Sequence, residues 1–180
     1  MSPNISGNRP RHTQRWIAVA VAAFVLGACA MPDTIKPGTT ETDVLSKFGK
    51  PDSQFTFASG NKRFEYNRGE WMQRSWMVDF DADGRVTSVD QVRTEAHFAA
   101  LRPGSDTQAS VREQLGTPFK VEYYPPSKLT GWLYPYREAG VYNSAMTVMF
   151  DPKGVFRRAE NGPDPRFMGG RDNGGSSGRN

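Results

Sequence analysis

The chain has 180 residues and a formal net charge of +4, which allows one medium-sized domain or two small ones. Three arginines and no acidic residue lie in residues 1–28, so the rest of the chain is almost neutral, and a basic nucleic-acid-binding domain is excluded. The single cysteine, Cys29, excludes an intramolecular disulfide and a thiolate metal cluster, and the two histidines, His12 and His97, argue against histidine-based catalysis.

Residues 1–28 have the three parts of a secretory signal peptide. A basic stretch ends at Arg15, an apolar run follows from residue 16 to residue 28, and the run closes on small residues. This run is shorter than the roughly 20 apolar residues that a membrane-spanning helix needs. The segment therefore predicts export and removal of the signal.

The end of this segment, Leu26-Gly27-Ala28-Cys29, resembles the bacterial lipobox. The resemblance implies cleavage between Ala28 and Cys29 and acylation of Cys29, and two or three acyl chains give stable membrane anchoring. Ala30 stands where an aspartate would favour inner-membrane retention, so the resemblance implies the outer membrane, with the protein on its periplasmic face. A plain signal peptide or a short membrane anchor with an incidental cysteine is the alternative. Residues 29–34 would form the lipid-anchored linker.

The mature chain contains an internal duplication. Residues 36–86 and residues 102–156 carry turn, cap and aromatic residues in the same order. Because so many matches in one order are not expected by chance, we interpret them as two copies of one module. The matched pairs include Gly38 and Gly104, Thr40 and Thr107, Val44 and Val111, Gly49 and Gly116, Pro51 and Pro118, Tyr66 and Tyr134, and Phe80 and Phe150.

Each copy begins with a predicted short helix. Thr40 and Thr107 are suitable N-caps, since a hydroxyl can accept a hydrogen bond from a backbone N–H in the first turn. Gly49 and Gly116 suit the left-handed position that ends a helix, and a proline follows two residues later. A further short helical stretch is expected around residues 94–101.

The remainder of each copy alternates with period two, which predicts antiparallel strands joined by tight turns. The expected fold is therefore α+β, with two tandem modules of short helices packed on small antiparallel sheets that could join into one. Their expected bounds are 35–92 and 93–160. Residues 161–180 are rich in glycine and are expected to be a disordered tail.

The shared frame of caps, glycine stops, sheet aromatics and an Asp-containing turn resembles the SmpA/OmlA (BamE-like) family. That resemblance implies two helices on a three-stranded sheet, an outer-membrane lipoprotein, and an accessory role in the machinery that inserts β-barrel proteins. Family members of this kind carry one module, whereas this chain has two, and tandem modules are similar to the β-lactamase inhibitor protein.

These observations predict a non-enzymatic, protein-binding outer-membrane lipoprotein without a cofactor. Its expected partner is a cell-envelope protein, in β-barrel assembly or envelope integrity. The alternative is an enzyme inhibitor that binds its target through a joined sheet surface.

The strongest metal-site candidate is an acidic loop that could follow the spacing of a calcium-binding loop. Its possible ligands are Asp79, Asp81, Asp83 and Asp90. The flanking residues are predicted to form strands instead of helices. In the second copy the ligand positions are occupied by Met149, Asp151 and Lys153, so only one carboxylate is kept. A hairpin turn of acidic residues is the alternative.

Two other constellations have ordinary structural explanations. Glu65 and Glu70, or Asp79 with Asp81, could be a general acid–base pair, but alternating carboxylates usually lie on the solvated side of a sheet. His97 is expected to be a surface or linker residue.

Candidate contact residues lie on the strands and in aromatic segments. The outward strand residues of the first copy form a charged, wet set: Arg63, Glu65, Met77 and Asp79. Those of the second copy are less polar: Leu133, Pro135, Thr147 and Met149. We expect partner contact to centre on Leu133 and Met149, beside loops that hold Tyr123 and Tyr124, with Trp71 as a further exposed anchor. The alternative is that the linker or the other module covers this face.

Overall fold

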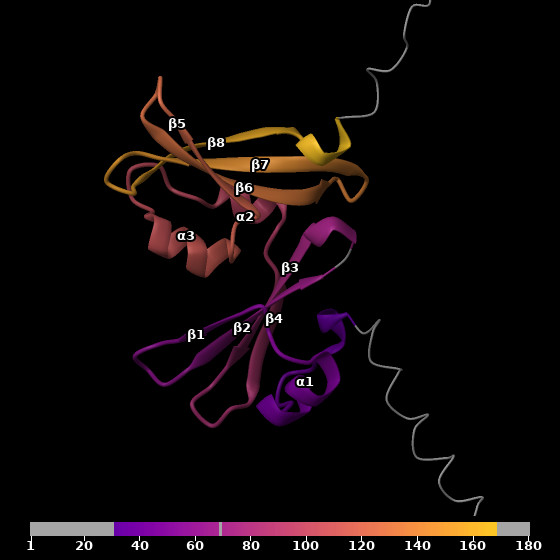
Figure 1. Cartoon of the computed structure of the whole chain (residues 1–180). Coiled ribbons are helices and arrows are strands. Elements are labelled where there is room, and N and C mark those ends of the chain that lie inside the picture. The colour runs from indigo at the N-terminus through magenta and orange to yellow at the C-terminus, as the bar shows by residue number, and fades with distance from the viewer. Residues whose placement is uncertain (1–30, 69, 169–180) are drawn as a thin grey trace, which may run out of the picture. The chain divides into compact units, whose positions relative to one another are not determined.

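The computed structural model of the chain describes residues 31–68 and 70–168 (Figure 1). The expected signal peptide, its cleavage site at Ala28 and the lipidation site Cys29 lie outside the described residues, as does the segment 169–180. Among the described helices, none is both long enough and apolar enough to cross a membrane.

The first module is a four-stranded antiparallel sheet with short helices. The strands follow the order β1-β2-β3-β4, and each pairs with its neighbour in sequence. The elements are η1 (Pro32–Thr34), α1 (Glu41–Phe48), β1 (Ser53–Thr56), β2 (Lys62–Arg68), η2 (Glu70–Met72), β3 (Arg74–Phe80) and β4 (Val86–Gln91).

The second module repeats this arrangement with the strand order β5-β6-β7-β8. Its elements are α2 (Glu95–Ala99), α3 (Gln108–Leu115), β5 (Lys120–Tyr124), β6 (Leu129–Glu138), β7 (Tyr142–Phe150), β8 (Phe156–Pro163) and η3 (Pro165–Phe167). The predicted α+β fold of two tandem modules is therefore confirmed.

Three details of the predicted fold need correction. Each sheet has four strands instead of three, and within the described residues the two sheets are separate, so one joined sheet is not formed. The expected tail begins too early, because residues 161–168 complete β8 and form η3. The first module also begins earlier than expected, because residues 32–34 of the expected linker form η1, and Pro32 is buried.

The same local interactions shape both modules. Thr40 accepts a hydrogen bond from the backbone N–H of Asp43, and Thr107 does so from that of Ser110. In the β-turns after β3 and β7, Asp81 and Asp151 each accept two backbone N–H bonds. Both third strands also carry a register shift just before their last phenylalanine. The duplication inferred from the sequence is therefore present at the level of hydrogen bonds.

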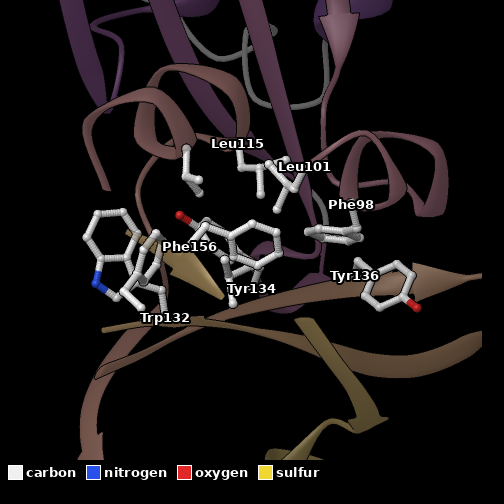
Figure 2. Close-up of a cluster of buried hydrophobic side chains, with 10 residues drawn as sticks. Phe98, Leu101, Leu115, Trp132, Tyr134, Tyr136 and Phe156 are labelled. Carbon is white, nitrogen blue, oxygen red and sulfur yellow. The ribbon is translucent and has the colours of Figure 1, made fainter. Parts of the chain in front are cut away.

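Each module has its own hydrophobic core between the helices and one face of the sheet. Figure 2 shows the core of the second module, in which Phe98, Leu101 and Leu115 of the helical segment face Tyr134 and other aromatic side chains of the sheet. Burial of each large apolar side chain contributes roughly 1.5–3 kcal/mol. The corresponding cluster of the first module includes Val44, Phe64, Tyr66, Val78 and Phe80.

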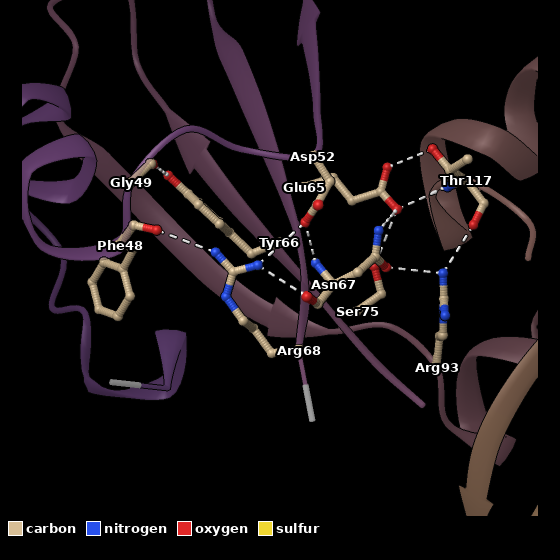
Figure 3. A network of polar contacts seen from close by, with 10 residues as sticks. All are labelled: Phe48, Gly49, Asp52, Glu65, Tyr66, Asn67, Arg68, Ser75, Arg93 and Thr117. Carbon is tan, nitrogen blue, oxygen red and sulfur yellow. Dashed lines mark hydrogen bonds and ion pairs between the residues drawn. The ribbon is translucent and has the colours of Figure 1, made fainter. Parts of the chain in front are cut away.

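The two modules contact each other through the outer face of the first sheet, opposite its core. Glu65 in β2 is fully buried and accepts hydrogen bonds from the backbone N–H and the hydroxyl of Thr117, both at 2.9 Å (Figure 3). Met77 on the same face is also buried. The expected wet surface on the first copy is thus wrong at these two positions, because the corner that follows α3 covers them.

Arg93 is the second buried charge at this contact. Its guanidinium donates to the carbonyl of Thr117 at 2.8 Å and to the side-chain oxygen of Asn67 at 2.9 Å (Figure 3). Burial lowers the pKa of Arg93, and the nearby Glu65 carboxylate opposes that shift. The contact therefore depends on charged groups that are hydrogen-bonded across the two modules.

Candidate interaction surface on the second sheet

The outer face of the second sheet, defined as the face opposite α2 and α3, has an apolar centre between charged edges. Its cross-strand rows follow from the register of β5 to β8. One row is Glu122, Gly131, Met149 and Arg158, the next is Lys120, Leu133, Thr147 and Glu160, and the third is Pro135, Ala145 and Gly162.

A cavity of about 460 Å³ lies on this face. Its lining includes Leu133, Ala145, Thr147 and Gly162. A Cβ atom added to Gly162 would meet no heavy atom within 4 Å, whereas one added to Gly131 would meet Tyr124 at 2.8 Å. The hollow therefore lies over Gly162, while the side chain of Tyr124 fills the space over Gly131.

The charged side chains around the cavity are paired with their own neighbours. Lys120 pairs with Glu122 at 2.9 Å, and Arg158 pairs with Glu160 at 2.6 Å. These pairs combine opposite charges, so they give the rim no large net charge.

At one end of the cavity, Arg166 connects aromatic residues of both modules. Its guanidinium lies 4.5 Å from the ring centre of Phe119 and donates a hydrogen bond to the carbonyl of Trp71 at 2.7 Å. It also pairs with buried Asp164. Burial raises the pKa of Asp164, but hydrogen bonds from Arg166 outweigh burial, so the pKa stays below its ordinary value. Trp71 packs edge-on against Phe167.

The structure places the five predicted contact residues differently. Leu133 and Tyr124 line the cavity. Met149 lies on the same face but is buried, and Tyr123 projects from the opposite face of β5 with 57 % of its surface exposed. The two tyrosines belong to a strand, so the predicted loop is wrong. Trp71 is 52 % exposed and lies at the aromatic end of the cavity.

The four aspartates of the calcium-loop candidate have different neighbours. Asp79 pairs with Arg63, and Asp90 contacts His97 at 2.9 Å. Asp81 caps its β-turn by accepting backbone N–H bonds, one of them from Asp83. The described parts of the chain contain no group of three or more metal-binding side chains. The calcium interpretation is therefore not supported, and the hairpin-turn alternative describes residues 81–84.

The other polar candidates also have structural roles. Glu65 is buried at the contact between the modules and is not on a solvated face. The side chain of Glu70 lies outside the described residues, so the acid–base pair stays untested. His97 bonds to Thr94, the N-cap of α2, and to Asp90.

Sequence reasoning missed Phe119, Gly162 and Arg166 as parts of this surface. Gly162 and Arg166 fell within the expected tail. The available signal was the Asp-Pro-Arg-Phe sequence at residues 164–167, in which Pro165 begins η3 and Asp164 caps it.

No protein-family model matches the chain, and no curated protein matches it significantly. Among solved structures, the chain is similar to a DUF4309 family protein (YjgB) from Bacillus subtilis, with 16% sequence identity and a TM-score of 0.30. That similarity covers 70% of this chain and 79% of the other.

Proposed function

We propose that this protein is a non-enzymatic outer-membrane lipoprotein that binds a protein partner in the cell envelope, in β-barrel assembly or envelope integrity. The observation that carries the proposal is the cavity on the outer face of the second sheet. The N-terminal lipobox supports the location, and the SmpA/OmlA-like frame supports the type of partner.

The composition of this surface supports protein binding. Protein interfaces have an apolar centre with few charges, surrounded by a polar rim. Here Leu133, Ala145 and Thr147 form the centre, and the paired charges of β5 and β8 form the rim. The exposed Trp71 and the partly buried Arg166 at one end are of the residue types that dominate binding energy.

The inhibitor alternative has less support. It relied on a surface shared by one joined sheet, but the two sheets are separate and the outer face of the first is covered at Glu65 and Met77.

Affinity purification from solubilised membranes tests the proposed binding. We expect the tagged wild-type chain to recover an envelope protein, and Leu133→Glu to lose it because a charge would enter the apolar centre. Val121→Glu is the matched control, since Val121 is exposed on the other face of the same sheet. Recovery of no envelope protein above background, or equal recovery by Leu133→Glu, would contradict the proposal.

The anchor has a separate test. Cys29→Ala should prevent acylation and leave the precursor uncleaved by the lipoprotein peptidase. Fractionation of this variant with the outer membrane after high-salt and carbonate washes would show that the lipid does not hold the protein there.

A further inference from the structure

The outer faces of the two sheets are equivalent, but they differ in what covers them. Glu65 and Met77 of the first sheet are fully buried under the corner that follows α3, whereas the equivalent Leu133 and Thr147 of the second sheet stay partly exposed beside η3. We infer that the cavity on the second sheet accepts the corner at the C-terminal end of a helix in the partner protein, with an apolar side chain at the corner. This inference rests on the proposed function and specifies the chemistry of the partner.

The contact within the chain shows how such a corner binds. Helix α3 is capped at its C-terminal end by Gly116. The next residue, Thr117, donates hydrogen bonds from its backbone N–H and its hydroxyl to the Glu65 carboxylate. A Cβ atom on Gly116 would lie 2.5 Å from the Glu65 carboxylate and 2.8 Å from Met77. The backbone of the corner thus lies directly on the outer face of the first sheet.

Strand register places the cavity at the same position on the second sheet. In the first module, Glu65 pairs with Met77 and Asn67 pairs with Ser75. The equivalent cross-strand pairs of the second module are Leu133 with Thr147 and Pro135 with Ala145. Three of these four residues, Leu133, Thr147 and Ala145, line the cavity. The hollow is therefore the counterpart of the surface that receives Gly116 and Thr117.

The two surfaces differ in polarity, and this difference specifies the ligand. At one position the change is from apolar to polar, because Thr147 takes the place of Met77. Polar residues at four other positions of the first module are replaced in the second module by residues with apolar side chains. The replacements are Glu65 by Leu133, Asn67 by Pro135, Ser75 by Ala145, and Arg93 by Pro163. On the second sheet, a threonine at the corner would lack the carboxylate that accepts its hydroxyl and N–H hydrogen bonds in the first module. An apolar side chain would instead pack against these residues without leaving a polar group unsatisfied.

Among the described residues, the helix corner that a second copy of this chain leaves free is not apolar. The equivalent corner of its first module follows α1 at Gly49 and carries the exposed Lys50. The carboxylates at the cavity, Glu122 and Glu160, are already paired with Lys120 and Arg158. Placing the ammonium group of Lys50 against Leu133 and Ala145 would therefore require its desolvation. Charge and polarity therefore favour a different protein.

Site-specific photo-crosslinking tests the inference in living cells. A benzoylphenylalanine at Thr147, on the floor of the cavity, would be compared with one at Val121, on the other face of the sheet. Both variants would be expressed as the full, tagged chain. Crosslinked peptides would be identified by mass spectrometry and located on the partner's structure.

A crosslink from position 147 to an apolar residue at a helix C-terminal corner supports the inference. A crosslink to an extended strand, to a charged segment or to a second copy of this chain would overturn it. Of these, the strand and the charged segment of another envelope protein would leave the proposed function intact. Absence of any protein crosslink from position 147 would overturn both.

Filling the cavity provides an independent readout. Gly162→Phe adds a ring where nothing lies within 4 Å of the new Cβ, and we expect the crosslink yield from position 147 to fall at least about tenfold. Ala159→Phe is the control, because it adds the same group to the opposite face of β8. Equal yields in the two variants, with unchanged melting temperatures, would contradict the inference.

Discussion

Gly116 combines a positive φ with a close approach to the other module. Its φ of 79° is in the left-handed region, as is the φ of 75° at Gly49. Only Gly116, however, has neighbouring atoms where a Cβ would be placed, whereas the space beside Gly49 is open. The same helix-ending glycine is thus needed for backbone conformation in one module, and for conformation and close approach in the other.

Substitution by alanine separates these two requirements. Gly49→Ala should lower the free energy of unfolding by roughly 1–2 kcal/mol, the cost of a left-handed non-glycine residue. Gly116→Ala should lower it by a further ~1–3 kcal/mol, because the methyl group overlaps Glu65 and Met77. Urea unfolding followed by circular dichroism measures both values. Equal losses in the two variants would mean that the modules do not approach each other closely at Gly116.

Asp106 links stability to acidic pH. Its buried carboxylate accepts a hydrogen bond from the backbone N–H of Arg102 at 2.6 Å and another from Ser110, and these bonds keep its pKa below the ordinary value. The folded chain therefore releases this proton more readily than the unfolded chain does. The stabilisation is present above the unfolded pKa of about 3.9 and is lost as the pH falls through the lower folded pKa.

The corresponding experiment compares the wild-type chain with Asp106→Asn between pH 7 and pH 2. The variant should be less stable at pH 7, and its stability should decline less steeply below about pH 4. Parallel acid profiles for the two proteins would contradict this role of Asp106.

At the level of elements, the sequence predicted on which face of the sheet each strand residue lies, but it did not predict which parts of the chain cover that face. Period-two alternation correctly placed Leu133 and Met149 on one face of the second sheet. It could not show that Met149 is buried, because burial there depends on its contact with the neighbouring strands. Likewise, alternation assigned Glu65 to the outer face of the first sheet but carried no information on the corner that covers it.

This difference in burial predicts opposite effects for two substitutions on the second sheet. Leu133→Glu should leave the melting temperature almost unchanged and reduce partner binding, since Leu133 is partly exposed in the cavity. Met149→Lys should instead lower the free energy of unfolding by about 2 kcal/mol or more, because it buries an ammonium group. Differential scanning fluorimetry with quantitative pull-down distinguishes the two. A large loss of stability in Leu133→Glu would identify its face as ordinary core.

At the level of the whole molecule, local signals predicted the two modules, and long-range contacts account for what was missed. The threonine caps, glycine stops and Asp turns act within a few residues, so the sequence indicates them directly. The hydrogen bond between Glu65 and Thr117 joins residues 52 positions apart and has no local signature. The end of β8 was also missed, because the glycine- and proline-rich composition of residues 162–165 resembles that of a tail.

The contact between the modules joins two different surfaces, and contacts of this kind can in principle repeat without end. Repetition would require the corner after α1 of one copy to bind the cavity on the second sheet of another copy. Lys50 at that corner opposes this association, because its charge does not match the apolar centre of the cavity. Lys50→Leu should therefore convert the mature chain into concentration-dependent filaments or rings, detectable by light scattering after size exclusion. Lys153→Leu, in an exposed turn, should remain as monodisperse as the wild-type chain. If Lys50→Leu does not form larger assemblies, or still forms them when combined with Gly162→Phe, Lys50 is not what prevents copies of this chain from associating through the cavity.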